Sequence, residues 1–342
     1  MVQAPQSKIF GEETSKFQPE STHPERLINL KINKDDLSDL NEDINEYVYN
    51  IYANAISGKF LPPEINKNLI VNGPSGGGQW FGGAVSPSGI LYAQINKIPF
   101  IIDLKVKQKI DYFKNNDNLY IKKCSECHGR LRNGLDNKKL DLKVPSIAGL
   151  SLTTLSNKKD YFNKIKNNHK SLELKDSEIK DIVNEMFEID IKALENKDLY
   201  YDSTFSYFED QFGNIGTKPP WGEVVAVDIN QGKLLWKIEN GSIEVSLDKN
   251  NTKNVLGSPS YGGVLLLKSD ILVTTGSYDS KSYFIDAING NVLHSIKMEA
   301  PGSAPPTTYI LDDEQYIAFV ATGNIKQNGS SAKIVVYKLS AN

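Results

Sequence analysis

The sequence has few of the residues that bind metals or form redox sites: among 342 residues there are two cysteines, four histidines and three methionines. Lysine and arginine (39) nearly balance aspartate and glutamate (42), so the formal charge is −3 and no basic surplus suggests nucleic-acid binding. Apolar runs such as 98–104 have the length of a core strand, not of a membrane span. The N-terminus lacks the charged start, apolar stretch and cleavage site of a signal peptide.

Two stretches of the chain have the pattern of β-strands. In residues 72–104, β-forming side chains recur in an alternating pattern bounded by glycine and proline turns. The same strand pattern is found from residue 219 to the C-terminus. The segments 226–236 and 284–294 also align without a gap. Each predicts a strand, a tight turn and a second strand, and a repeat of this size suggests propeller blades, with two chance hairpins as the alternative. The aligned pairs are Asp228 with Asp286, Gly232 with Gly290 and Trp236 with His294.

Helical patterns occupy the rest of the chain. Residues 1–63 are polar, with one helical periodicity over 41–56. Over 113–190 glycine becomes scarce while lysine, asparagine and aspartate increase. The clearest helix there covers 176–189, with Asp176 or Ser177 as its cap and one apolar stripe. The sequence therefore predicts a mainly β protein interrupted by an α-helical insert of about 80 residues.

Both cysteines lie in one pentapeptide, Cys-Ser-Glu-Cys-His at 124–128. A structural zinc site needs four ligands, but the other three histidines are scattered singly. A thioredoxin-like dithiol needs a parallel βαβ unit, which the sequence around residue 124 does not indicate. Covalent haem needs two thiols followed directly by a histidine for the iron, and the pentapeptide supplies this arrangement. We therefore predict haem c, with Cys124 and Cys127 as thioether anchors and His128 as the proximal iron ligand.

The surroundings of the pentapeptide resemble a small class I cytochrome c. In that family a tyrosine four residues before the first cysteine, a glycine after the histidine and a later Pro-x-Ile/Leu-x-Gly recur, and this chain has Tyr120, Gly129 and 145–149 at these places. The resemblance implies that the Pro145 carbonyl accepts the N–H of the proximal imidazole. It also implies that Ile147 packs on the porphyrin.

The sixth iron ligand departs from the family pattern. Members of the family place a methionine before the last helix, but this chain has Leu172 about there. Met186 lies on the apolar stripe of the helix and is expected in the core. His169 is the nearest alternative ligand, although a solvent-exposed loop histidine is an equal interpretation. A histidine in place of methionine would lower the reduction potential, while no sixth ligand would leave the iron open to small molecules.

The β segments resemble the C-terminal half of pyrroloquinoline quinone (PQQ)-dependent dehydrogenases of the glucose, quinate and shikimate type. The resemblance lies in "GGGQWFGGAVSPSGILYA", "PPWGEVVAVDINQGKLLWKI" and the segments 256–296 and 302–324, with upstream matches in "GEETSKFQPE", "DDLSDL" and "FLPPE". It implies an eight-bladed propeller that holds PQQ and Ca²⁺, with an aspartate as base. Some members of the family carry a cytochrome c domain.

The same resemblance implies that much of the enzyme is missing from this chain. The catalytic base and the Ca²⁺ ligands lie mostly in the first half of the family's propeller, so no catalytic residue is assigned. Trp80 and Trp221 match tryptophan motifs near the cofactor and could lie against the quinone, with packing between blades as the alternative. Trp236 is expected to pack. We expect the missing N-terminal propeller half as a partner and no activity from this chain alone.

The resulting prediction is a partial eight-bladed quinoprotein propeller with an inserted all-α cytochrome c domain. Its function would be to relay electrons from the reduced quinone through haem to a quinone or a soluble cytochrome, in the periplasm. Since covalent haem attachment takes place outside the cytoplasm, the missing signal peptide suggests a truncated or split reading frame. The alternatives are a non-catalytic c-type cytochrome on a β scaffold and a propeller binding module with a decayed haem site. The expected divisions are a connecting segment 1–63, a blade segment 64–112, a haem domain 113–192, a linker 193–218 and C-terminal blades 219–342.

Overall fold

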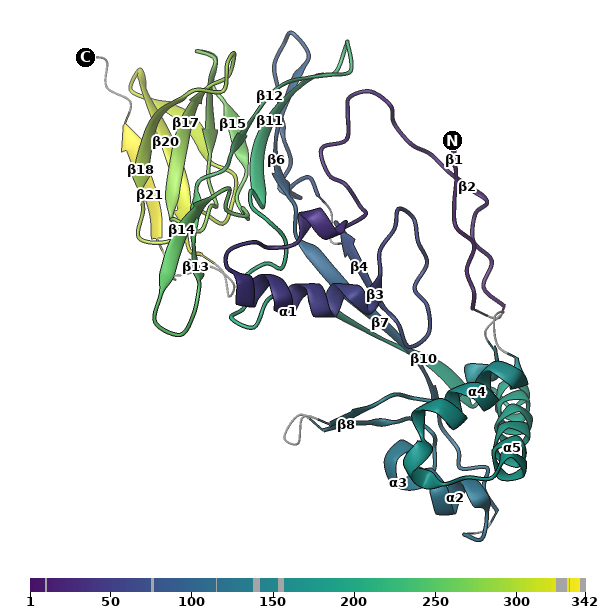
Figure 1. Ribbon diagram of the computed structural model, residues 1–342. Helices are drawn as coiled ribbons and strands as arrows, with labels where there is room; N and C mark the ends of the chain where they lie inside the picture. Colours follow the sequence, from purple (N-terminus) through teal and green to yellow (C-terminus); the bar gives the residue numbers. More distant parts are fainter. Residues whose placement is uncertain are drawn as a thin grey trace.

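The computed structural model consists of a β part and a smaller helical part (Figure 1). The two parts are joined by a long two-stranded ribbon, formed by β7 (Pro99–Gln108) and β10 (Leu199–Tyr207). The structure describes residues 1–9, 11–74, 77–114, 116–137, 142–152, 157–323, 331 and 333–338. None of the helices in these described ranges has the length and apolar character that a bilayer crossing requires.

Three antiparallel sheets follow one another in the β part, as expected for a sector of a propeller. The first has the order β12-β11-β6-β5, the second β15-β16-β17-β18 and the third β19-β20-β21. Tyr92 and Ala226 of the first sheet pack against Leu272 and Ile285 of the second. The strands are β5 (Ala84–Val85), β6 (Ile90–Asn96), β11 (Gly222–Asp228), β12 (Lys233–Glu239), β15 (Val264–Leu266), β16 (Ile271–Thr274), β17 (Lys281–Asp286), β18 (Val292–Lys297), β19 (Thr307–Leu311), β20 (Glu314–Ala321) and β21 (Lys333–Lys338).

The predicted repeat is confirmed as two hairpins in neighbouring sheets, β11–β12 and β17–β18. Asp228 accepts the backbone N–H of Asn230 at 2.9 Å, and Asp286 makes the corresponding turn contact. The turn glycines Gly232 and Gly290 have positive φ values of 63° and 79°, which side chains with a Cβ rarely adopt.

Trp236 packs between neighbouring sheets, as predicted. Its indole N–H donates to the Ala287 carbonyl at 3.0 Å, and its ring lies against Tyr92. A Cβ added at Gly290 would come within 3.0 Å of the Trp236 ring. The repeated glycine therefore allows both the turn and the close packing of the tryptophan.

A fourth sheet carries the connection to the helical part. Its order is β10-β7-β4-β3, with β3 (Ala55–Ile56), β4 (Asn68–Asn72), β7 (Pro99–Gln108) and β10 (Leu199–Tyr207). Strands β7 and β10 pair antiparallel along their whole length, so the segment expected to be a linker contains a strand. The predicted N-terminal helix is α1 (Glu42–Ala53), and its cap Asn41 accepts the N–H of Ile44 at 2.8 Å.

The helical part folds around its last helix, α5 (Asp176–Glu195). Tyr120 packs on Ile182 and Met186 of this helix, and Tyr161 packs on its neighbouring face. The cap of α5 is Lys175, not the predicted Asp176 or Ser177, because Glu178 accepts the Lys175 N–H at 2.7 Å. The other elements are α2 (Leu119–Lys123), α3 (Ser125–His128), β8 (Leu135–Asn137), β9 (Leu142–Val144), α4 (Lys158–Asn168) and the short 3-10 turns η2 (Leu150–Leu152) and η3 (Lys170–Leu172).

The remaining elements are a 3-10 turn and two further strand pairs. The 3-10 turn η1 (Lys34–Asp36) precedes α1, and Asp36 accepts the backbone N–H of Asn33 at 2.7 Å. Two further antiparallel pairs are formed by β1 (Val2–Gln3) with β2 (Phe17–Gln18) and by β13 (Ser242–Ser246) with β14 (Thr252–Leu256).

Candidate functional site

The pentapeptide with both cysteines is held by two short helices. Asn118 caps α2 by accepting the N–H of Tyr120 at 2.8 Å, and Cys124 lies at the junction of α2 with α3. Helix α3 ends at Gly129, whose φ of 74° suits glycine. The buried Tyr120 hydroxyl donates to the Gly129 carbonyl at 2.9 Å. This bond ties the start of the motif to its end.

A cavity of about 980 Å³ opens beside the motif. Its lining includes Cys124, Cys127 and His128, side chains from α4, η3 and α5, and residues 8–9 and 64–67. Its volume is at the upper end of the roughly 300–1,000 Å³ typical of sites for organic ligands and cofactors. The apolar residues of its wall include Ile147, Leu150, Ile165, Leu172, Leu174 and Ile182. A flat apolar group of cofactor size therefore fits between the motif and the helices.

His128 has the tautomer that a metal-binding imidazole needs. Its Nδ1 lies 3.1 Å from the Pro145 carbonyl oxygen, which can only accept, so Nδ1 carries the proton and Nε2 keeps its lone pair. Burial lowers the pKa of His128, and the nearby His169 lowers it further, which favours the neutral ring. The contact between His128 and Pro145 is the one that the cytochrome resemblance implies, and Ile147 lines the same cavity.

His169 and His128 both line this cavity. Their ring centres are 6.1 Å apart, with an angle of 47° between the ring planes. Leu172, at the position expected for a methionine, lines the cavity and has no atom that can bind iron. Met186 is buried, as expected for a core residue, although it also reaches the cavity wall.

The two other interpretations of the cysteine motif gain no support. In the described residues no group of three or more His, Cys, Asp or Glu side chains gathers as a metal site, whereas structural zinc uses four ligands. Both thiols are free, and burial raises the pKa of Cys124 to about 11, with the Cys127 charge as a smaller cause. Reactive redox dithiols have lowered thiol pKa values.

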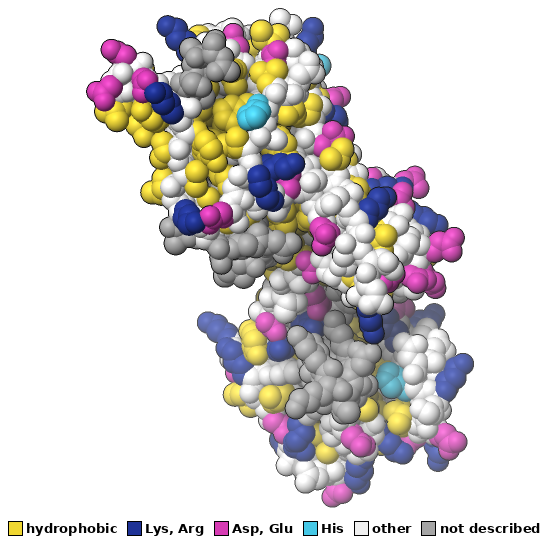
Figure 2. Space-filling view, turned by 90° about the vertical axis from the view of Figure 1, so that its left-hand side faces the viewer, with side chains coloured by type: hydrophobic (Ala, Val, Ile, Leu, Met, Phe, Trp, Pro, Cys, Tyr) yellow, Lys and Arg dark blue, Asp and Glu magenta, His cyan; other side chains and the backbone are white. Residues whose placement is uncertain are grey.

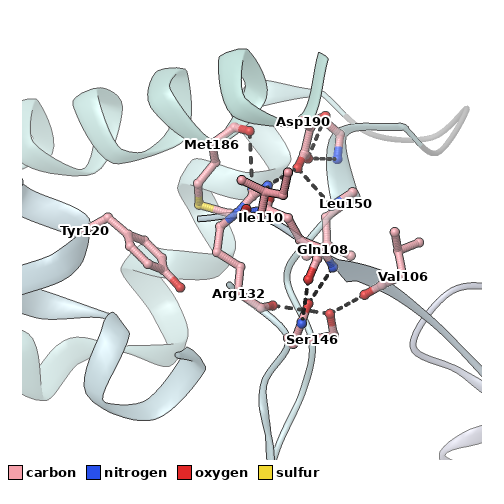
Figure 3. A network of polar contacts seen from close by, with 12 residues as sticks. Val106, Gln108, Ile110, Tyr120, Arg132, Ser146, Leu150, Met186 and Asp190 are labelled. Atoms are coloured by element: carbon pink, nitrogen blue, oxygen red, sulfur yellow. Dashed lines mark hydrogen bonds and ion pairs between the residues drawn. The ribbon is translucent and has the colours of Figure 1, made fainter. Parts of the chain in front are cut away.

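A buried polar network around Arg132 and Asp190 packs next to this site (Figure 3). The sequence did not predict this network. Arg132 and Asp190 are 0% and 1% exposed and form an ion pair of 2.6 Å. Asp190 also accepts the N–H groups of Gly149 and Ser151 at 2.9 and 3.1 Å. Gln108, at the end of β7, accepts from the Arg132 guanidinium. Bonded partners in this network are up to 58 positions apart, so no local pattern predicts their pairing.

The backbone of Arg132 fixes the segment that supplies Pro145. The Arg132 carbonyl accepts the N–H groups of Ile147 and Ala148 at 2.8 and 3.1 Å. Ser146 donates its hydroxyl to the Val106 carbonyl of β7. The proline carbonyl that orients His128 is therefore anchored both to the helical part and to the ribbon.

The two predicted quinone-facing tryptophans lie in different environments. Trp80 is 80% exposed and rests against Phe81, with ring centres 4.6 Å apart. Trp221 is 1% exposed, packs with Val245 and Val255, and donates its indole N–H to the Thr217 carbonyl at 2.8 Å. This environment favours the packing role for Trp221 and leaves the face of Trp80 open.

Comparison with known proteins identifies a family whose model matches most of the chain. The family model described as "PQQ: Glucose/ethanol/alcohol dehydrogenase, beta-propeller domain" matches residues 1–164 and 148–317. The quinoprotein glucose dehydrogenase of Gluconobacter oxydans is 33% identical over 114 residues, which cover 31% of this chain and 14% of that protein. The glycerol dehydrogenase large subunit of the same organism is 28% identical over 145 residues, which cover 41% of this chain and 20% of that subunit.

Among solved structures, the quinohemoprotein alcohol dehydrogenase of Comamonas testosteroni matches with a TM-score of 0.38 and 13% identity, over 80% of this chain and 28% of that one. A europium-containing methanol dehydrogenase matches with a TM-score of 0.32 and 11% identity, over 70% of this chain and 24% of that one. The chain spans a fifth or less of the curated relatives described above.

Proposed function

Since the chain belongs to the β-propeller family of PQQ-dependent glucose, ethanol and alcohol dehydrogenases, we propose that it is the haem-carrying part of such an oxidoreductase. Its substrates would be alcohols or sugars oxidised at a CH–OH group. The helical part would pass electrons from the reduced quinone to an acceptor, either a membrane quinone or a soluble cytochrome. This function accounts both for the dehydrogenase family of the chain and for the cavity beside the cysteine motif in the helical part.

The observation that carries the proposal is the contact between His128 and Pro145 at the edge of the cavity. Cys124 and Cys127 lie on the same wall as a neutral imidazole whose Nε2 is free. These three side chains would hold a haem c, with Ile147 against the ring. Bound there, haem would supply a one-electron carrier. The reduced quinone holds two electrons, and haem would pass them on one at a time to an acceptor that takes single electrons.

The chain's own residues would determine how that carrier is held. The Pro145 carbonyl orients His128 and makes it a stronger electron donor, because the ring N–H is hydrogen-bonded. The apolar side chains of the cavity wall would pack against the haem ring. The ribbon of β7 and β10 tethers the helical part to the sheets, so the haem would keep a high effective concentration near the quinone.

The quinone itself would require the rest of the propeller. We expect PQQ and Ca²⁺ to bind the completed enzyme, with the exposed ring of Trp80 available for stacking against the quinone. The outer face of the third sheet exposes apolar side chains that another blade would cover. Figure 2 shows hydrophobic side chains gathered on this side of the β part. They include Tyr309, Leu311, Ile334 and Val336.

Covalent haem gives a direct test. We would export the full chain behind a bacterial leader peptide into a periplasm that contains haem-attachment machinery, where covalent attachment is expected to occur. After denaturing electrophoresis, haem should stay on the chain, and its mass should include one haem. The double variant Cys124→Ala/Cys127→Ala should lose it, while Glu126→Ala, at an exposed position in the same motif, should keep it.

The result that contradicts the proposal is a chain without covalent haem under conditions in which another c-type cytochrome matures. The relay role has a second test. The haem-loaded chain with PQQ, Ca²⁺, sugars or polyols and a dye should show no turnover. Addition of the remaining propeller should restore reduction of the haem by substrate. Haem that stays oxidised in the completed protein would favour the alternative, a non-catalytic cytochrome on a β scaffold.

A further inference from the structure

The position of His169 is fixed by the backbone on both sides. Its N–H donates to the Ile165 carbonyl at 3.0 Å at the end of α4, and its own carbonyl accepts the N–H of Leu172 at 3.0 Å. Helix α4 is capped at its other end by Asn157, which accepts the N–H of Asp160 at 2.9 Å. The imidazole therefore projects from a helix end and a closed turn.

The distance between His169 and His128 matches two ligands of one ion. Two bonds of about 2 Å from a metal to imidazole nitrogens, plus the distance from each nitrogen to its ring centre, place the ring centres roughly 6 Å apart. The observed separation of the two ring centres is 6.1 Å. His128 already has its Nδ1 on the Pro145 carbonyl, which leaves Nε2 for the iron.

One ring nitrogen of His169 has no hydrogen-bond partner among the described residues. This nitrogen, Nδ1, is buried. A buried polar nitrogen is normally paired, because an unpaired one has lost its bonds to water. The His169 ring lines the cavity, whose wall is largely apolar, so a group bound there would lie against the imidazole.

We propose that His169 binds the haem iron opposite His128, giving a bis-histidine centre. This inference rests on the proposed haem function. The competing ligand is Met186, which also reaches the cavity, but it packs in the apolar cluster of Tyr120 and Ile182. An imidazole in place of a thioether lowers the reduction potential of the haem. The relay would then give electrons more readily to its acceptor.

Spectroscopy of the full haem-loaded chain tests the proposal. The oxidised protein should be low-spin and lack the near-red Met-to-iron band. In His169→Ala the spectrum should become high-spin and return to low-spin when imidazole is added. In His169→Met the near-red band should appear and the midpoint potential should rise. His294→Ala is the matched control, since this histidine lies on β18 beside Phe284, and its spectrum should match wild type.

The outcomes separate this proposal from the haem function itself. A chain with no covalent haem contradicts the proposed function. Covalent haem with a low-spin His169→Ala spectrum identical to wild type overturns the bis-histidine proposal alone. A near-red band in the wild-type chain that disappears in Met186→Leu also overturns it and assigns Met186 as the ligand. An unchanged spectrum in Met186→Leu supports His169.

Discussion

The buried ion pair of Arg132 and Asp190 should stabilise the helical part through its two partners together. We expect Arg132→Met to destabilise α5 by about 3 kcal/mol, the lower end for breaking a buried pair. Asp190 would keep its bonds from Gly149 and Ser151, which partly satisfy the remaining charge. Asp190→Leu should cost about 5 kcal/mol, because it leaves the guanidinium unpaired and removes the acceptor of two buried N–H groups.

The double variant Arg132→Met/Asp190→Leu should cost less than the two single changes added together. Once one partner is gone, removal of the other removes a buried charge, so we expect a coupling of about 2 kcal/mol. The chain has two structural parts, so the local opening free energy of α5 is the quantity to measure, by native-state hydrogen exchange with mass spectrometry. Amides of β16, in the β part, provide the internal control.

Two results would refute this reasoning. Additivity of the single variants within about 0.5 kcal/mol would mean that the two charges do not stabilise each other. Equal protection of α5 in all variants would mean that the pair contributes nothing to its stability. The pair also has a consequence for the cavity. Arg132 anchors the segment of Pro145 by its backbone carbonyl, so Arg132→Met should leave the contact between His128 and Pro145 in place, since the backbone bonds remain.

Further predictions concern side chains whose burial differs. Trp221→Ala should destabilise the β part by about 3–5 kcal/mol, because the ring is fully buried, while Trp80→Ala should change its stability by less than about 0.5 kcal/mol. Limited proteolysis of the intact chain should separate them, and equal susceptibility would contradict the assignment. In the haem-free chain near pH 8, iodoacetamide should modify the exposed Cys127 before Cys124, since a pKa of about 11 leaves roughly one Cys124 thiol in a thousand ionised. Mass spectrometry of partly labelled chain would show the reverse order if the environments are wrongly assigned.

Local patterns in the sequence predict the features that depend on near neighbours. The aspartate and glycine of each repeated turn indicate both hairpins, because a carboxylate on turn amides and a positive φ are local requirements. The apolar stripe likewise predicts α5. By contrast, nothing local pairs Arg132 with Asp190 or Gln108, and the cap of α5 lies one residue earlier than expected. Those contacts depend on how distant segments pack.

The candidate site also contains some features that the sequence predicts and one that it does not. The cysteine motif is contiguous, so its residue types and spacing alone indicate the chemistry, and the cytochrome resemblance supplies Pro145 for His128. For His169, the sequence is equally consistent with an iron ligand and with a solvent-exposed loop histidine. The separation of the two rings depends on where α4 ends, which spacing along the chain does not determine. The structure therefore gives His169 a position that the sequence could not.

The point of insertion explains how a propeller can accommodate a helical part of this size. The insert leaves the sheet at Gln108 and returns at Leu199, and these two residues are paired neighbours in the ribbon. Its ends are therefore already close together, and the pairing of β7 with β10 continues the sheet up to the junction. Loop-closure cost rises only slowly with length, so a unit with its own core can occupy this place without disturbing the blades. The same ribbon fixes Gln108 against Arg132, so the sheet that carries the insert also helps to hold the segment that orients His128.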